Sequence, residues 1–78
     1  MNTDKRLELT DLAYDFYKTS RSSGKDITLV IFWDSITVDY NNGEIHSTCY
    51  INLDGNFDEQ KEILLKKITD LINIYFQL

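Results

Sequence analysis

The apolar positions of the chain predict a helix at each end. Between Thr3 and about Ser20 they recur at the i, i+3, i+4, i+7 spacing of a helix with one apolar face: Leu9, Leu12, Ala13 and Phe16. Between Asn56 and Leu78 they alternate by three and four, with two neighbours that widen the stripe: Leu64, Leu65, Ile68, Leu71, Ile72, Tyr75 and Leu78. Asn56 and Glu59 have the spacing of a capping box, so we expect Asn56 to cap the second helix and Thr3 the first.

Residues 26–53 alternate in the manner of three strands. The pair Asn42-Gly43 is favoured in two-residue type I′ hairpin turns, because both central positions need positive φ. A turn there places Asp39 opposite His46, and a second two-residue turn at Asp34-Ser35 extends the meander backwards. With both turns, one face of the sheet collects the expected core: Ile27, Leu29, Ile31, Trp33, Ile36, Val38, Tyr40, Ile45, Cys49, Ile51 and Leu53.

These elements predict an α+β fold, in which a three-stranded antiparallel β-meander is flanked by N- and C-terminal helices (α-β-β-β-α). Both helices are expected to pack on one sheet face, since that buries both apolar stripes in one core. Seventy-eight residues suffice for a single domain, 1–78, and the sequence contains no internal repeats. The strand order is open, because the first strand is the most apolar and would also suit the centre of the sheet.

Charge is distributed unevenly along the chain, whose net charge is −5. Residues 26–59 hold seven acids and no Lys or Arg, whereas the rest of the chain holds six acids and eight bases. A surface of one negative sign repels nucleic acid and favours basic partners.

We expect no membrane contact, because no stretch approaches the ~20 apolar residues of a membrane span. The N-terminus lacks an apolar run typical of a signal peptide, and a lone cysteine suits a reducing compartment, so a cytoplasmic location is expected.

Few residues have the types and spacing that a metal site or a catalytic site requires. Asp54, Asn56 and Asp58 offer oxygen ligands at alternate positions, as an EF-hand loop begins, but the residues at the sixth and twelfth loop positions are wrong for calcium. His46 and Cys49, three apart on a strand, point to opposite faces and cannot act together. We therefore expect no metal site, no cofactor and no enzymatic activity.

The sheet face opposite the core carries aromatic and apolar side chains among polar ones. Polar β-formers would suffice on a solvated face, yet Val30, Phe32 and Tyr50 are expected there. Asp39 and His46 are expected to form a cross-strand ion pair on the same face. Aromatic anchors within a polar rim are typical of protein-binding surfaces. The predicted partner-binding residues are therefore Val30, Phe32, Asp39, His46, Thr48 and Tyr50.

Two functions fit this surface. The first is a small acidic protein-binding module that docks on a basic surface of a larger protein and inhibits or neutralises it, as an inhibitor, an immunity protein or a nucleic-acid mimic does. The alternative is a homodimeric structural or regulatory subunit that associates through the outer sheet face or the C-terminal helix. In that helix Ile74 and Phe76 are the expected dimer contacts, because apolar residues there surround most of its circumference.

Overall fold

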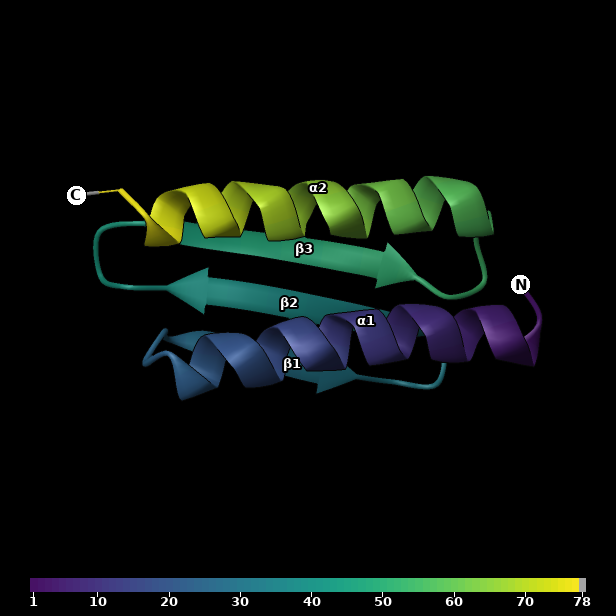
Figure 1. Ribbon diagram of the computed structural model, residues 1–78. Coiled ribbons are helices and arrows are strands. Elements are labelled where there is room, and N and C mark those ends of the chain that lie inside the picture. The colour runs from purple at the N-terminus through teal and green to yellow at the C-terminus, as the bar shows by residue number, and fades with distance from the viewer. Residues whose placement is uncertain (78) are drawn as a thin grey trace.

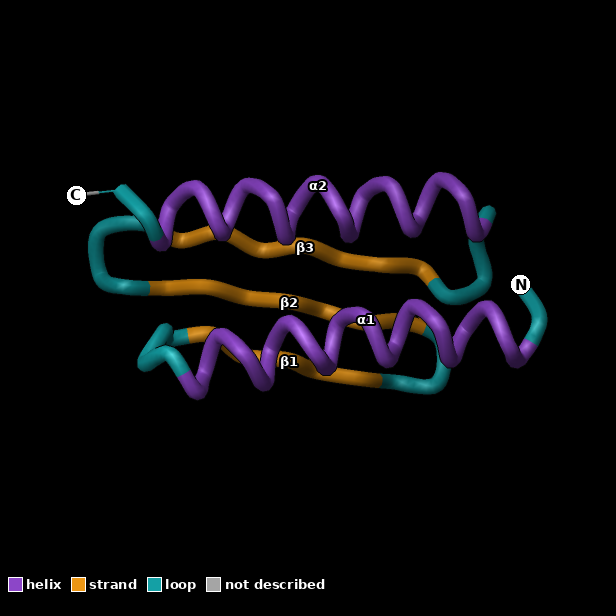
Figure 2. The backbone as a smooth tube through the Cα atoms, in the orientation of Figure 1, coloured by secondary structure: helices purple, strands orange, loops and turns teal. Residues whose placement is uncertain are grey.

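A computed structural model describes residues 1–77 and contains two helices and one sheet (Figure 1). The elements are α1 (Thr3–Ser22), β1 (Ile27–Ile31), β2 (Ser35–Asn41), β3 (His46–Asn52) and α2 (Phe57–Tyr75). The strands are antiparallel in the order β1-β2-β3, and both helices pack on one face of the sheet (Figure 2). The predicted α-β-β-β-α fold is confirmed. The apolar β1 lies at an edge and not in the centre.

The core lies between the two helices and the sheet. α1 packs over β1 and β2, α2 packs over β3, and the helices also contact each other. Each element contributes at least one fully buried apolar side chain: Leu9, Ile27, Ile36, Val38, Ile51, Leu64 and Leu71. Burying a side chain of this size stabilises the fold by about 1.5–3 kcal/mol, so these residues carry much of the hydrophobic stabilisation.

Both hairpins are wider than the predicted two-residue turns. His46 pairs with Asn41 and not with Asp39, and Ile36 pairs with Ile31 and not with Trp33. The observed register of each hairpin therefore differs from the predicted register by two residues. Because successive side chains of a strand alternate between faces, a displacement of two leaves every strand residue on its predicted face.

The second hairpin is wider because the side chain of Asn42 closes the loop. Its Oδ1 accepts hydrogen bonds from the backbone N–H groups of Glu44 at 3.0 Å and Ile45 at 2.7 Å. Gly43 has a φ of 90°, but no other type of residue in the described chain has a positive φ. Asn42 therefore does not adopt the conformation of a type I′ turn, and that prediction is wrong. Ile45, an expected core residue, lies in this loop and is only partly buried.

The first hairpin removes two residues from the predicted core. The N–H of Phe32 donates to the carbonyl of Ser35 at 2.8 Å, so residues 32–34 form the turn. Trp33 is consequently 77% exposed, and Ile31, at the end of β1, is 46% exposed. The prediction that Ile31 and Trp33 belong to the core is wrong. Trp33 lies in the turn after β1, and the helices do not fully cover Ile31, the last residue of β1.

The helices begin at asparagine side chains. Asn2 Oδ1 accepts the N–H of Lys5 at 2.9 Å, so Asn2 and not Thr3 caps α1. Asn56 Oδ1 accepts the N–H of Glu59 at 3.0 Å and caps α2, as predicted. Each cap satisfies a backbone donor that the first helical turn leaves without a partner.

α2 buries a narrower stripe than its sequence predicted. Leu65 and Ile72 are exposed, so the expected widening of the stripe is wrong. Ile74 is partly buried against the core, whereas its sequence position placed it away from the core stripe. The sheet and a single neighbouring helix cover only part of the helix circumference. The predicted role of Leu78 lies outside the described residues.

Candidate protein-binding surface

The open face of the sheet, opposite the helices, presents two rows of side chains that cross all three strands. One row is Thr28, Asp39 and Thr48, and the other is Val30, Thr37 and Tyr50. Val30 is 40% and Tyr50 60% exposed. Phe32, in the turn after β1, is 59% exposed. The three apolar residues that the sequence singled out for binding are therefore accessible at the same end of the sheet.

Asp39, His46 and Thr48 form a polar cluster at the other end of this face. The hydroxyl of Thr48 donates to Asp39 Oδ1 at 2.5 Å, and His46 Nε2 contacts the same oxygen at 2.7 Å. The contact of Asp39 with His46, which the sequence predicted, is thus present but diagonal, since Thr48 lies directly opposite Asp39. The hydrogen bond from Thr48, opposed by partial burial and aided by His46, holds the pKa of the Asp39 carboxyl below its ordinary value.

The polar cluster lacks the arrangement of a catalytic triad. In a triad the two ring nitrogens of histidine serve different partners, one the nucleophile and the other the acid. Here Thr48 Oγ1, at 3.4 Å, and Asp39 Oδ1 both approach Nε2 of His46. The cluster also lies on an exposed sheet face. Its hydroxyl, carboxylate and imidazole are accessible and can donate or accept hydrogen bonds.

A second apolar surface adjoins Phe32, and sequence analysis missed most of it. We call Leu7, Ile31, Phe32 and Trp33 the apolar tip. All four are exposed and line one shallow groove between the first turns of α1 and the β1–β2 turn. The signal for the apolar tip was the unbroken apolar run from Leu29 to Trp33, which exceeds what a half-buried alternating strand needs.

Arg6 holds the apolar tip in place. Its Nη1 donates to the carbonyl of Trp33 at 2.5 Å, and its guanidinium carbon lies 5.9 Å from the centroid of the Trp33 ring. Its Nη2 donates to Asp54 Oδ1 at 2.6 Å in the turn between β3 and α2. One side chain therefore ties both turns to α1. Groups that are ordered in this way before binding lose less conformational entropy on forming an interface.

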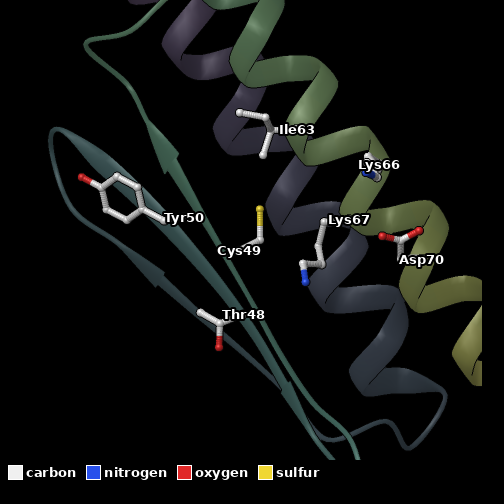
Figure 3. Close-up of a pocket in the computed structure, with 7 residues that line it drawn as sticks. All are labelled: Thr48, Cys49, Tyr50, Ile63, Lys66, Lys67 and Asp70. Carbon is white, nitrogen blue, oxygen red and sulfur yellow. The ribbon is translucent and has the colours of Figure 1, made fainter.

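A groove between β3 and α2 lies beside the open face (Figure 3). Its lining residues are Thr48, Cys49, Tyr50, Ile63, Lys66, Lys67 and Asp70. Lys67 Nζ donates to Ser47 Oγ and so joins the helix to the strand. Cys49 lies between strand and helix, and burial raises the pKa of its thiol. The thiol therefore stays protonated at neutral pH, and Cys49 packs as a small core residue.

The remaining predicted site residues have structural partners or lie apart. Asp54 binds Arg6 and Asn56 caps α2, so the alternate oxygens of the EF-hand-like segment do not converge. Within residues 1–77, no three His, Cys, Asp or Glu side chains gather closely enough to hold a metal ion. Phe76, a predicted dimer contact, is exposed beyond the end of α2. Over the same described range, no helix combines the length and apolarity needed to cross a membrane.

The charges divide between the two layers of the molecule. Seven of the eight Lys and Arg residues lie in the two helices, whereas residues 26–56, which contain the sheet and its turns, hold five acids and no Lys or Arg.

Comparison of the chain with protein-family models, with curated proteins and with solved structures gave no match in any of the three.

Proposed function

We propose that this protein is a small binding module that docks on a basic surface of a larger protein and inhibits or neutralises it. The docking surface is the apolar tip together with the open face of the sheet. The observation that carries the proposal is the run of four consecutive exposed apolar side chains, residues 30–33, which continues across Thr37 to Tyr50. Apolar patches that combine aromatic anchors with polar neighbours are typical of protein-binding surfaces.

The charge of the sheet layer supports a basic partner. Asp34 flanks the apolar tip and Asp39 lies on the open face, while Asp54 is paired with Arg6. No Lys or Arg occurs between residues 26 and 56. Opposite charges across an interface accelerate encounter and fix orientation more than they add affinity. Affinity would come from the aromatic side chains, each contributing about 1.5–3 kcal/mol on full burial.

Inhibition follows from occupying such a surface and needs no catalysis. Basic surfaces of proteins commonly bind nucleic acid or acidic substrates, and a rigid acidic module that covers one competes with those ligands. Inhibitors, immunity proteins and nucleic-acid mimics all act in this way. The single cysteine is free and buried, which suits work in the reducing cytoplasm.

Site-specific photo-crosslinking tests the proposal. A photoreactive amino acid replaces Phe32 in one variant and Leu65, an exposed apolar residue on α2, in the control. In host cells, the Phe32 position should capture one basic protein and the Leu65 position should not. Capture of the same protein from both positions, or of none, contradicts the proposal.

Binding to the purified partner then tests the chemistry. Phe32→Asp should weaken the affinity by roughly tenfold or more, because it removes an exposed aromatic that the partner would bury and adds a charge where apolar contact is needed. Leu65→Asp, with the same change of chemistry on α2, should leave the affinity unchanged. The association rate should fall as salt is added. A rate that is independent of salt would contradict a basic docking surface.

A further inference from the structure

The outer edge of β1 carries backbone groups that no other element uses. Two hydrogen bonds to β2, from Asn41 N–H to the carbonyl of Asp26 and from Phe32 N–H to the carbonyl of Ser35, fix the pattern of the ladder. In an antiparallel pair, residues with inward and outward backbone groups alternate. The N–H and C=O groups of residues 27, 29 and 31 therefore point away from β2. No turn, loop or side-chain hydrogen bond recorded for residues 1–77 involves them.

The sequence of β1 offers none of the features that keep an edge strand from pairing. Ile27–Ile31 reads ITLVI, with no charged residue and no proline, and its pairing with β2 contains no bulge. Natural edge strands are usually protected by charges, proline, bulges or a covering segment. An apolar and regular edge of this kind is a template for a further strand.

We propose that β1 pairs with β1 of a second copy, in antiparallel orientation, about a two-fold axis at Leu29. In this register Ile27 of one copy lies opposite Ile31 of the other, and Leu29 lies opposite Leu29. All three outward-pointing residues of each copy then form hydrogen-bonded pairs. Three donors in each copy meet three acceptors in the other, which gives six hydrogen bonds. The interface is self-complementary, as a two-fold contact must be.

The flanking residues complement one another in the same register. The register brings Lys25, in the loop before β1 of one copy, toward the β1–β2 turn of the other copy, which contains Trp33 and Asp34. A cation is thereby placed near an exposed aromatic ring and a carboxylate at both ends of the interface. Each copy has a net charge of −5, but β1 itself contains no charged residue. Pairing of the two β1 strands therefore places no like charges opposite each other within the strands.

The pairing also covers the residue that the helices leave exposed. Ile31 is 46% exposed on the helix side of the sheet, and the register sets it beside Ile27 of the second copy, which is buried in its own core. Leu7, which lines the groove with Ile31, extends this apolar edge onto α1. On the open face, Val30 lies beside Thr28 of the second copy.

The dimer goes beyond the proposed function. It covers Ile31 of the apolar tip and leaves Phe32, which lies outside the paired strand, and the open face of the sheet accessible to a larger partner. It joins two three-stranded sheets into one of six strands and doubles the open face. It also differs from dimers through the outer sheet face or through Phe76, because its contacts are backbone groups of one edge strand.

Sedimentation equilibrium with amide hydrogen exchange tests the proposal. The wild-type chain should sediment as a dimer at micromolar concentrations, with the amides of Leu29 and Ile31 protected in the dimer and unprotected on dilution. Thr48→Pro provides the matched control, because Thr48 N–H points away from β2 on the opposite edge. Ile31→Pro should raise the dissociation constant roughly tenfold or more, while Thr48→Pro leaves it unchanged.

Ile31→Asp gives a second variant that keeps the backbone donor and places a carboxylate in the paired strands. It too should dissociate the dimer. A wild-type monomer at these concentrations, a dimer with unprotected β1 amides, or a dimer that survives both Ile31 substitutions would overturn the proposal. None of these outcomes bears on capture of a basic partner, so the two proposals fail separately.

Discussion

The two edges of the sheet differ in how their backbone groups are satisfied. At the end of β3, Asn52 donates its N–H to Gln60 Oε1 at 2.9 Å and accepts the N–H of Gly55 at 3.1 Å on its carbonyl. Lys67 of α2 binds Ser47 on the same strand. β1 has no such contacts on its outer side in the described chain. Side chains of α2 thus cover the β3 edge at Ser47 and Asn52, whereas no side chain of the described residues covers the backbone groups of the β1 edge.

Burial shows the same asymmetry within a single row of the sheet. Ile31, Ile36 and Ile51 lie side by side across β1, β2 and β3 on the helix-facing side. Ile36 and Ile51 are fully buried, whereas Ile31 is 46% exposed. Two helices over three strands therefore complete the core at the β3 edge and leave it incomplete at this end of β1. The exposed end is where the sequence concentrates its excess of apolar residues.

Substituting the two outer isoleucines gives the largest expected effect. Ile51→Ala should lower the free energy of unfolding by about 2–5 kcal/mol, because it opens a cavity in a closed core. Ile31→Ala should lower it by less than about 1 kcal/mol in dilute solution, because nearly half of Ile31 is already exposed to water and its removal leaves no closed cavity. Urea denaturation at low protein concentration measures both.

Protein concentration sharpens the same comparison. If Ile31 is covered by a second copy, the loss of stability in Ile31→Ala should grow as concentration rises, while that in Ile51→Ala should not. Equal losses for both variants in dilute solution would contradict the asymmetry of the two edges.

The sequence predicted which face each strand residue occupies better than it predicted the turns. Alternation along a strand is a local property, so it held through both registers even though each is displaced by two residues. The turn at Asn42-Gly43 was predicted from backbone preference. The side chain of Asn42 instead bonds the backbone of Glu44 and Ile45 and closes a wider loop, an outcome that dipeptide statistics do not reveal.

The candidate site was predicted only in part for a related reason. Val30 and Tyr50 were assigned to the open face by alternation, and their exposure follows from it. Ile31 and Trp33 were assigned to the core by the same rule, but burial depends on how far the helices extend over the sheet. Sequence periodicity contains no information on that extent, because it is set by packing between elements distant in the chain.

Removing the protection of the β3 edge should have an intermediate effect. Gln60→Ala leaves the N–H of Asn52 without its side-chain acceptor and should lower the free energy of unfolding by about 1 kcal/mol. Gln60→Glu keeps an acceptor oxygen and should retain most of the stability. The amide of Asn52 should exchange faster in Gln60→Ala alone. Unchanged exchange in that variant would show that Gln60 does not protect the edge.

The smallest expected effect concerns the polar contacts that join β2 to β3 and have no counterpart toward β1. Asp39 binds Thr48 and His46 on the β3 side, while Thr28 lies opposite it on β1. Its folded pKa lies below the ordinary value of 3.8, so the folded chain takes up this proton less readily than the unfolded chain. The stability that Asp39 contributes is therefore complete above about pH 4 and is lost as the pH falls through the lowered folded pKa.

Unfolding measured from neutral to acid pH tests this assignment. The difference in stability between wild type and Asp39→Asn should narrow below about pH 4, since protonation removes the charge that the substitution also removes. Thr48→Val should flatten the acid dependence most, because the Thr48 hydroxyl is the main cause of the lowered pKa. Thr28→Val, on the β1 side of the same row, should leave it unchanged. An equal response to both valine substitutions would show that the polar contacts of Asp39 do not distinguish the two sides of the sheet.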